Sequence, residues 1–554
     1  MRVLTAAVLR WRSSPWTRVG LLLIVATTIA TPLARPGFVG AVFTAGTDSD
    51  GNTFTAAASF ALASPSGLNA TSGLEGQVPV AWDPVADAEE YQVRYRLAGD
   101  PTWTEEPWTD DTSQTISALT NNEVYDFSVR ARNPQRTSPW APATPVTAMP
   151  RQWAQIATAG GGDPVPWDDP PVSDEHTCAV TVSGRAYCWG DNRYGQLGSG
   201  DDVEYVTTPT PVETTSGLTD SNVVAVTTGW HHTCAVTADA SAYCWGRNNS
   251  GQVGIGDDAA YVATPTPVDT TSGLTTTNVA QLSASGWHTC AVTTAGRAYC
   301  WGWNDGTLGD GTTQDRDTPT PVETTTGLTT TNVAAVAAGD EHTCAVTTAG
   351  QAYCWGRNEL GQLGDGTTAA GGDPAVATPT PVDTTTGLTA TNVAAITSGG
   401  YHSCAVTTAG RAYCWGTNWN GRLGNGTAAD ADNSAVPTPT AVDTSTGLTA
   451  TNVAGIVAGT HHTCAVTTAG QGYCWGRNLS GELGSGDADL NVTTPTPIDT
   501  TTGLTTTNVA QLSAGYAYTC AATTAGQAYC WGRNDSGQLG DGTTTQRTTP
   551  TRVN

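Results

Sequence analysis

The stretch from His342 to Gly356 reads HTCAVTTAGQAYCWG and carries two cysteines ten positions apart. Close copies of this stretch recur every 54 to 60 residues. Self-similarity with such a period is typical of propellers and solenoids, because each copy is one small unit that buries its apolar face against the next. The copies contain all 14 cysteines of the chain, in seven pairs whose two members are each ten positions apart: Cys178 with Cys188, Cys234 with Cys244, Cys290 with Cys300, Cys344 with Cys354, Cys404 with Cys414, Cys464 with Cys474, and Cys520 with Cys530.

Four short strands are predicted in each copy. Examples are residues 332–339, 342–347 and 352–356, and a fourth strand of the Pro-Thr-Pro-Val type seen at 319–322. Seven complete four-strand units between residues 150 and 554 favour an all-β fold, a seven-bladed β-propeller, because closing the ring leaves no sheet edge open. An open superhelix of the same units is the alternative. The sequence does not indicate how a ring would be latched.

The cysteine spacing predicts a disulfide inside every blade. A three-residue hairpin loop over 348–350, with Gly350 in the left-handed conformation, places Cys344 directly opposite Cys354. Opposed residues of antiparallel strands have Cα atoms about 4.5–5.5 Å apart, which is within disulfide range.

A zinc site is the alternative for the same residues. In six of the seven copies a histidine stands two positions before the first cysteine, on the same face of the strand. One histidine and two cysteines supply at most three ligands, and thiols oxidise in the compartment outside the cell, where the first 34 residues, described next, predict that the protein is sent. We therefore predict no metal and no cofactor. The histidines are His176, His232, His288, His342, His402 and His462, and the seventh copy has Tyr518.

The first 34 residues have the composition of an export signal. Four arginines precede an apolar run over 21–26 that is too short to span a bilayer comfortably. An uncleaved membrane anchor is the alternative. We expect a signal peptide over 1–34, a linker or short hairpin over 35–65, and an extracellular or cell-surface protein with no other membrane contact.

The chain is strongly acidic, with 49 Asp and Glu against 23 Arg and no Lys, and its net charge is −26. Nucleic acid and anionic membranes would repel it, so neither is expected as a partner. The absence of Lys excludes lysine-based chemistry, and no phosphate-binding loop, nucleophile elbow or metalloprotease motif occurs. We therefore expect no enzymatic activity, although carboxylate pairs such as Glu341 and Glu359 occur.

Residues 66–149 are predicted to form a separate small β-sandwich, because short alternating runs are separated by turn residues. This segment resembles a fibronectin type III domain in Trp82, in the strand from Tyr91 to Tyr95, and in Leu119, which stands six residues before Tyr125. The last spacing is that of a tyrosine corner, in which the phenol bonds backbone. The resemblance implies a spacer or adhesion module.

The repeats over 150–554 resemble the regulator of chromosome condensation family. The motif that carries the resemblance is WGRNDSGQLG at 531–540, which recurs in every copy and is one residue shorter at 301–309. The resemblance implies a seven-bladed propeller, and a packing and hydrogen-bonding role for the histidines. The family's nuclear member is a guanine-nucleotide exchange factor, but no exchange residues can be matched here. Exported relatives that inhibit β-lactamases bind protein through one rim.

Alternating strand directions place two sets of connections, after the first and third strands of each copy, on one rim. Large aromatic and acidic residues vary there from copy to copy, whereas the opposite rim is nearly uniform. Recognition residues commonly lie in loops on a rigid scaffold. The alternative is that the aromatic residues fold over and pack. The predicted binding residues are Trp167, Asp168, Tyr194, Trp230, Trp287, Trp303, Glu341, Glu359, Tyr401, Trp419 and Tyr516.

These patterns favour a secreted or cell-surface scaffold that recognises a partner protein through the variable rim. A lectin-like propeller that binds polysaccharide is the alternative, because aromatic side chains beside Asp, Asn and Glu suit sugar rings. An enzyme or an exchange factor is the least favoured function.

Overall fold

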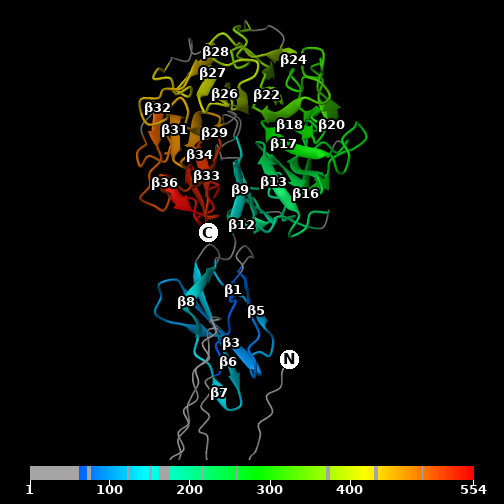
Figure 1. Ribbon diagram of the computed structural model, residues 1–554. Helices are drawn as coiled ribbons and strands as arrows, with labels where there is room; N and C mark the ends of the chain where they lie inside the picture. The colour runs from blue at the N-terminus through cyan, green and yellow to red at the C-terminus, as the bar shows by residue number, and fades with distance from the viewer. Residues whose placement is uncertain are drawn as a thin grey trace, which may run out of the picture.

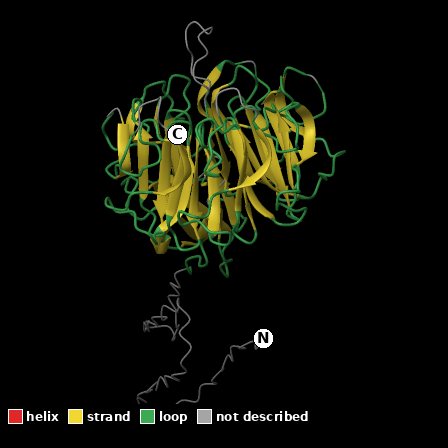
Figure 2. Cartoon of the chain, turned by 90° about the horizontal axis from the view of Figure 1, so that it is seen from above, coloured by secondary structure: helices red, strands yellow, loops and turns green. Residues whose placement is uncertain are grey.

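The computed structural model describes residues 62–70, 76–120, 124–148, 152–160, 175–201, 203–214, 217–257, 259–369, 375–428, 435–488 and 491–553. Every helix or strand found in these ranges is a β-strand, which confirms the all-β prediction (Figure 2). No helix in the described ranges is long and apolar enough to cross a membrane. The predicted export signal, most of the predicted linker, Trp167 and Asp168 lie outside the described residues.

The strands between residues 69 and 148 form a β-sandwich. One sheet has the order β1-β2-β5 and the other the order β4-β3-β6-β7, with β8 paired to β6. The strands are β1 (Asn69–Ala70), β2 (Val78–Ala81), β3 (Glu90–Leu97), β4 (Thr104–Glu105), β5 (Ser113–Ile116), β6 (Tyr125–Asn133), β7 (Arg136–Thr137) and β8 (Ala141–Ala148).

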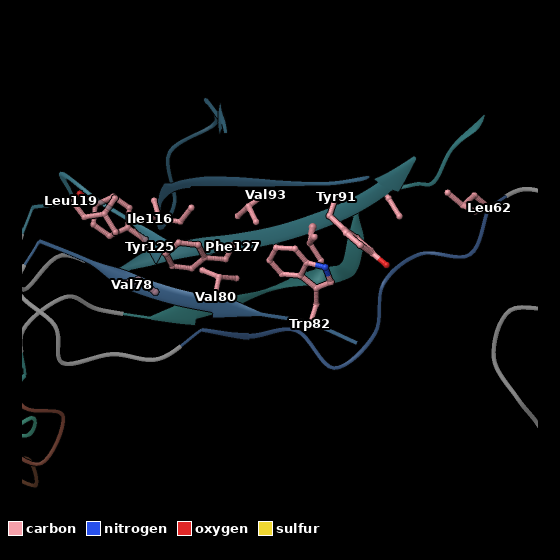
Figure 3. Packing of buried hydrophobic residues seen from close by; sticks show 12 residues of the cluster. Leu62, Val78, Val80, Trp82, Tyr91, Val93, Ile116, Leu119, Tyr125 and Phe127 are labelled. Carbon is pink, nitrogen blue, oxygen red and sulfur yellow. The ribbon is translucent and has the colours of Figure 1, made fainter. Parts of the chain in front are cut away.

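Apolar side chains from both sheets meet in the core of the sandwich (Figure 3). Trp82 is 5% exposed, and Val93 and Phe127 are fully buried. The phenol oxygen of Tyr125 accepts a hydrogen bond from the backbone N–H of Thr120 at 3.0 Å. This contact confirms that the phenol closes the preceding loop onto the strand.

The larger sheet carries a stack of arginine and tryptophan side chains that the sequence analysis did not anticipate. Its arginines stand two apart on β3 and two apart on β6, so each pair shares a face. The guanidinium carbons lie 4.1 to 5.3 Å from the tryptophan ring centroids. In order, the members of this Trp–Arg stack are Arg132, Trp108, Arg130, Trp140, Arg94, Trp103 and Arg96.

The repeats form a closed ring of blades. The described residues contain seven four-stranded antiparallel sheets, and the first strand of each lies nearest the central axis (Figure 1). First strands of neighbouring blades contact each other around the whole ring, including β9 with β33. The seven-bladed propeller is therefore confirmed, and the open superhelix is excluded.

The blades have closely similar strand lengths. Blade 1 has β9 (Trp153–Thr158), β10 (His176–Thr181), β11 (Ala186–Asp191) and β12 (Tyr205–Pro211); blade 2 has β13 (Val223–Thr228), β14 (His232–Thr237), β15 (Ala242–Arg247) and β16 (Tyr261–Pro267); blade 3 has β17 (Val279–Ser285), β18 (His288–Thr293), β19 (Ala298–Gly302) and β20 (Arg316–Pro321); blade 4 has β21 (Val333–Ala338), β22 (His342–Thr347), β23 (Ala352–Gly356) and β24 (Val376–Pro381). Blade 5 has β25 (Val393–Ser398), β26 (His402–Thr407), β27 (Ala412–Thr417) and β28 (Ala435–Ala441); blade 6 has β29 (Val453–Ala458), β30 (His462–Thr467), β31 (Gly472–Arg477) and β32 (Asn491–Pro497); blade 7 has β33 (Val509–Ala514), β34 (Tyr518–Thr523), β35 (Ala528–Gly532) and β36 (Arg547–Arg552).

The hairpin between the second and third strands has the predicted geometry. Cys344 and Cys354 are opposed in β22 and β23, with Cα atoms 4.1 Å apart, and are joined by a disulfide. Gly350 has φ +87°. The other predicted disulfides are confirmed in the same way, and they join Cys178 to Cys188, Cys234 to Cys244, Cys290 to Cys300, Cys404 to Cys414, Cys464 to Cys474, and Cys520 to Cys530.

The ring is closed by side chains of blade 7 that bond to blade 1. Neither blade borrows a strand from the other end of the chain, because each consists of four consecutive strands. The Gln511 amide exchanges two hydrogen bonds, of 3.2 and 3.1 Å, with the backbone of Ile156. Tyr518 donates to the carbonyl of His176 at 2.6 Å and accepts from the N–H of Ala159 at 3.0 Å. The tyrosine at the position that holds histidine in the other blades thus bonds the backbone of the first blade.

Glutamine clamps of the same kind join other innermost strands. Gln155 bonds both backbone groups of Val226, and Gln281 bonds those of Val336. The equivalent residue of blade 6 is Gly455, which lines a cavity of about 210 Å³ between blades 6 and 7. Glutamine clamps therefore join some neighbouring blades, whereas the seam between blades 6 and 7 has a cavity at the equivalent position.

The tryptophan of each Cys-Trp-Gly packs between blades. Trp355 is fully buried, and its Nε1 donates to the carbonyl of Thr307 in the preceding blade at 2.9 Å. Gly309 lies against this ring, where a Cβ would stand 2.6 Å from Nε1. Its φ of +67° also favours glycine. The motif residues therefore build the seams between blades.

Candidate binding face on the variable rim

Connections after the first and third strands of the blades lie together on one side of the ring. Arg357, which follows a third strand, bonds Glu341, which follows a first strand, at 3.2 Å. Gln538 and Glu175 make the same kind of contact between blades 7 and 1 at 2.6 Å. We call this side the variable rim. The hairpins such as 348–350 lie on the opposite side, which we call the uniform rim.

Blades 1 to 3 carry an arc of stacked rings on the variable rim. The ring of His231 lies 4.9 Å from that of Tyr194 and 5.6 Å from that of Trp287, between centroids. The guanidinium carbon of Arg247 lies 4.8 Å from the Tyr194 centroid and 4.3 Å from the Trp287 centroid. These residues therefore pack on one another across blade boundaries, and each is partly or fully buried.

Trp230 joins blade 2 to blade 4 beside the central axis. Its Nε1 donates to Oδ1 of Asp340 at 2.9 Å, and the same oxygen accepts from the Ser285 hydroxyl at 3.2 Å. Asp340 is 3% exposed. Residues from every blade, including Gly160 and Gly400, line a polar cavity of about 100 Å³ here. Trp230 is thus held in a structural role at the axis.

Blades 3 and 4 meet at a cluster of charges. Arg357 donates to Asp305 at 2.8 Å and to Glu341 at 3.2 Å, and its guanidinium carbon lies 5.8 Å from the centroid of Trp303. Burial raises the pKa of Glu341, Arg357 opposes this shift, and the carboxylates of Glu359 and Asp305 add to it. Three carboxylates therefore share one guanidinium, and Glu359 among them is exposed.

Blades 5 to 7 carry a second arc, which is built on a buried arginine. Arg422 is fully buried and donates to the carbonyls of Trp419 at 2.9 Å and Thr460 at 3.0 Å. Its Nη2 lies 3.3 Å from Nδ1 of His461, which accepts the bond because a guanidinium has no acceptor. The His461 ring lies 6.3 Å from Trp419 and 4.9 Å from Tyr516, between centroids.

Exposure separates the predicted binding residues into surface and support. Trp419 is 45% exposed, and Leu479, at the same repeat position of the next blade, is 49% exposed. Tyr516 is 5% exposed, so it supports the rim from below instead of lining it as predicted, because His461 and Arg477 cover its ring. The remaining predicted residues that the structure describes, apart from the exposed Glu359, are partly buried: Tyr194, Trp230, Trp287, Trp303, Glu341 and Tyr401.

A second exposed apolar group lies at the outer edge of the variable rim on blades 1 and 2. Tyr205 and Tyr261 begin the outermost strands of these blades and are 49% and 56% exposed. Val203, in the loop before Tyr205, is 46% exposed. The variable rim therefore has two separate exposed apolar groups. One consists of Val203, Tyr205 and Tyr261 on blades 1 and 2, and the other of Trp419 and Leu479 on blades 5 and 6.

Sequence reasoning missed Arg422 as a member of this face. Its signal was a departure from the repeat, because the corresponding residues in blades 1, 2, 4 and 7 are all glutamine. The backbone carbonyl at this position accepts hydrogen bonds from the tryptophan and from a threonine or serine of the next blade, and the carbonyl of Arg422 does so from Trp475 and Thr463. The side chain at this position is therefore free to change while the seam is kept.

The histidines of the zinc alternative serve the seams between blades. Each is fully buried, with Nε2 2.7–2.8 Å from a Thr or Ser hydroxyl of the next blade. For His342 this hydroxyl belongs to Ser403, which itself donates to the carbonyl of Gln362. Nε2 of His342 is therefore the donor, and the neighbouring cysteines are in disulfides. No group of three or more metal-ligating side chains was found in the described part of the chain.

Comparisons with known proteins agree with this architecture. Residues 320–554 match the RCC1-like domain, and residues 183–236 and 239–292 match the Regulator of chromosome condensation (RCC1) repeat. Ultraviolet-B receptor UVR8 of Arabidopsis thaliana is 32% identical over 411 residues, which cover 74% of this chain and 83% of UVR8. The chain belongs to the RCC1 family.

Two other RCC1-type proteins are similar to this chain over about two thirds of its length. E3 ubiquitin-protein ligase HERC2 of Homo sapiens is 33% identical over 372 residues, which cover 67% of this chain but 7% of HERC2. The solved structure of Prp20p from Saccharomyces cerevisiae has a TM-score of 0.58 at 23% identity and covers 68% of this chain and 87% of that one. The latter likeness shows the shared fold.

Proposed function

We propose that this RCC1-family propeller is a binding module that recognises a partner protein through its variable rim. The observation that carries the proposal is the exposure of two neighbouring apolar side chains on this rim. Trp419 is 45% exposed and Leu479 is 49% exposed, whereas most other large side chains of the rim are packed. Exposed aromatic and apolar side chains in loops on a rigid scaffold are typical of recognition sites. Aromatic residues are also enriched among those that dominate binding energy.

The relatives support protein recognition as the general role. Prp20p has been characterised for its binding to Gsp1p and histones. HERC2 is named as a ubiquitin ligase, but this chain spans 7% of HERC2, so the ligase activity is not carried over. We assign no reaction to the propeller, and the proposal concerns binding alone.

We further propose that the protein is exported and acts outside the cell or at its surface. The signal-like composition of residues 1–34 and the pairing of every cysteine in disulfides support this location. The sandwich would then be a fibronectin type III-like spacer, and the Tyr125 contact supports the resemblance to that fold. N-terminal sequencing of protein from the culture medium tests the export proposal, because a start at Met1 would contradict signal cleavage.

Affinity capture with the oxidised full chain tests the binding proposal. Baits would be the wild type, a double variant with Trp419→Ala and Leu479→Ala, and a control with Val182→Ala and Val224→Ala, whose residues are both 54% exposed and lie away from the variable rim. The baits would be offered extracellular proteins and insoluble polysaccharides. We expect a protein retained by the wild type and the control and lost from the rim variant. Retention of a polysaccharide instead would make the propeller a lectin.

A further inference from the structure

We propose, resting on the function proposed above, that the partner places an extended segment across blades 4 to 6, with a large apolar side chain beside a basic one. The apolar side chain would sit on Trp419 and Leu479. The basic side chain would face Glu359 and Glu341. The segment is therefore defined by the order of its side chains along the rim: an apolar side chain lies over blades 5 and 6, and a cationic side chain lies over blade 4.

The apolar half of the surface comes from one repeat position. The residue that follows the buried Asn of each WGxN motif points outward, and Trp419 and Leu479 hold this position in adjacent blades. The same position is charged or polar in the other five blades: Arg193, Asn249, Asp305, Glu359 and Asp535. Two neighbouring blades therefore carry an apolar residue at a position where the other five carry a charged or polar one.

The Trp419 loop is fixed before any partner arrives. Arg422 stands fully buried beneath it and holds its carbonyl at 2.9 Å, while the same guanidinium is anchored on Thr460 and His461. Asn420, next to Trp419, has φ +63°, a conformation that non-glycine residues seldom adopt. Backbone strain of this kind gathers at binding sites, and a side chain already held in place loses less entropy on binding.

The charged half of the surface lies on the blade 4 side of Trp419. Asp305 and Glu341 bond the single guanidinium of Arg357, at 2.8 and 3.2 Å, and Glu359 is close enough to interact with it while staying exposed. This leaves an excess of negative charge. On the other side, Asp535 is already paired with Arg533 at 2.7 Å. The field of the chain, with a net charge of −26, also favours a basic partner.

A phage-displayed library of random dodecapeptides, panned on the oxidised full chain, tests this inference. We expect enriched peptides to carry Trp, Phe or Leu close to Lys or Arg. Their binding should weaken about tenfold or more with Trp419→Ala, since aromatic anchors dominate interfaces. It should weaken several-fold with Glu359→Gln and with added salt, while Val182→Ala should leave it unchanged. Near-UV circular dichroism would confirm that each variant is folded.

The outcomes separate the two proposals. Peptides that need Trp419 but carry no basic residue would refute the stated chemistry and leave rim recognition standing. Peptides that depend on Tyr261, tested with Tyr261→Ala, would move the site to blades 1 and 2 and refute the inference alone. Peptides that bind every rim variant as well as the wild type would refute the proposed function too. No enrichment over the bare support would overturn the inference.

Discussion

Acid should loosen the seams between blades, because six imidazoles are buried there in the neutral form. Burial lowers the pKa of His176, His232, His342 and His462 to about 3, and that of His288 to about 4. The main physical cause is desolvation of the charged form, and the hydrogen bonding of His342 gives that form no compensation. Its Nε2–H is donated to Ser403, and its Nδ1 is buried without a hydrogen-bond partner, so a second proton would have no acceptor.

The direction in which stability changes with pH depends on whether the folded or the unfolded chain binds more protons. The unfolded chain takes up a proton at each histidine below the ordinary pKa of about 6.5, whereas the folded chain does so only near pH 3 to 4. Stability is therefore complete above pH 6.5 and falls as the pH drops. For one imidazole the loss between pH 6.5 and 5 is about 2 kcal/mol. Asp191 acts in the opposite direction, because burial raises its pKa to about 8.

Guanidinium chloride unfolding of the disulfide-intact protein at pH 7, 6 and 5, followed by tryptophan fluorescence, measures this loss. The variant His342→Gln keeps an N–H donor for Ser403 but cannot titrate. Its unfolding free energy should fall by about 2 kcal/mol less than that of the wild type between pH 7 and 5. A wild-type free energy that is flat over this range, or an equal loss in the variant, would refute the reasoning.

Four further substitutions follow from the blade and sandwich geometry. Gly350→Ala should destabilise the propeller by at least about 1 kcal/mol, because the φ of Gly350 is +87° and an added Cβ would lie 2.7 Å from backbone. Ala240→Gly should instead stabilise the propeller by up to about 1 kcal/mol, because Ala240 has a φ of +64°. Denaturation midpoints compare the pair. Gly455→Gln should raise the unfolding free energy by roughly 1 kcal/mol by filling the cavity between blades 6 and 7 and adding a clamp like that of Gln281; an unchanged midpoint would contradict this. Trp140→Ala should lower the sandwich's melting temperature, since it breaks cation–π contacts worth about 0.5–1 kcal/mol each, and an equal melting temperature would show that the stack does not stabilise the sheet.

The propeller could be predicted because its information is local and repeated. Cys344 and Cys354 stand symmetrically about a hairpin that ends in Gly350, so the register follows from the spacing alone. Seven copies of that hairpin then fix the number of blades. The latch was not predictable, because Tyr518 and Gln511 act on residues more than 340 positions away.

The surface of the rim was less predictable than its location. Sequence variation identified the loops that lie together on this rim, but the exposure of their side chains depends on what the neighbouring blade contributes. Tyr516 is covered by His461 and Arg477 from blade 6, whereas Leu479 stays open. The Trp–Arg stack was missed for the same reason, because its tryptophans lie outside the strands that carry the arginines. The pairs of arginines two apart on β3 and β6 were its one readable signal.

Photo-crosslinking from the two rims tests the central account most directly. The photoreactive residue p-benzoylphenylalanine would replace Trp419 in one sample of the full chain and Val182 in the other. The account predicts a discrete protein adduct from position 419 and none from position 182. An adduct from position 182 alone, or none from position 419 in the presence of a partner that the wild type captures, would contradict binding through the variable rim.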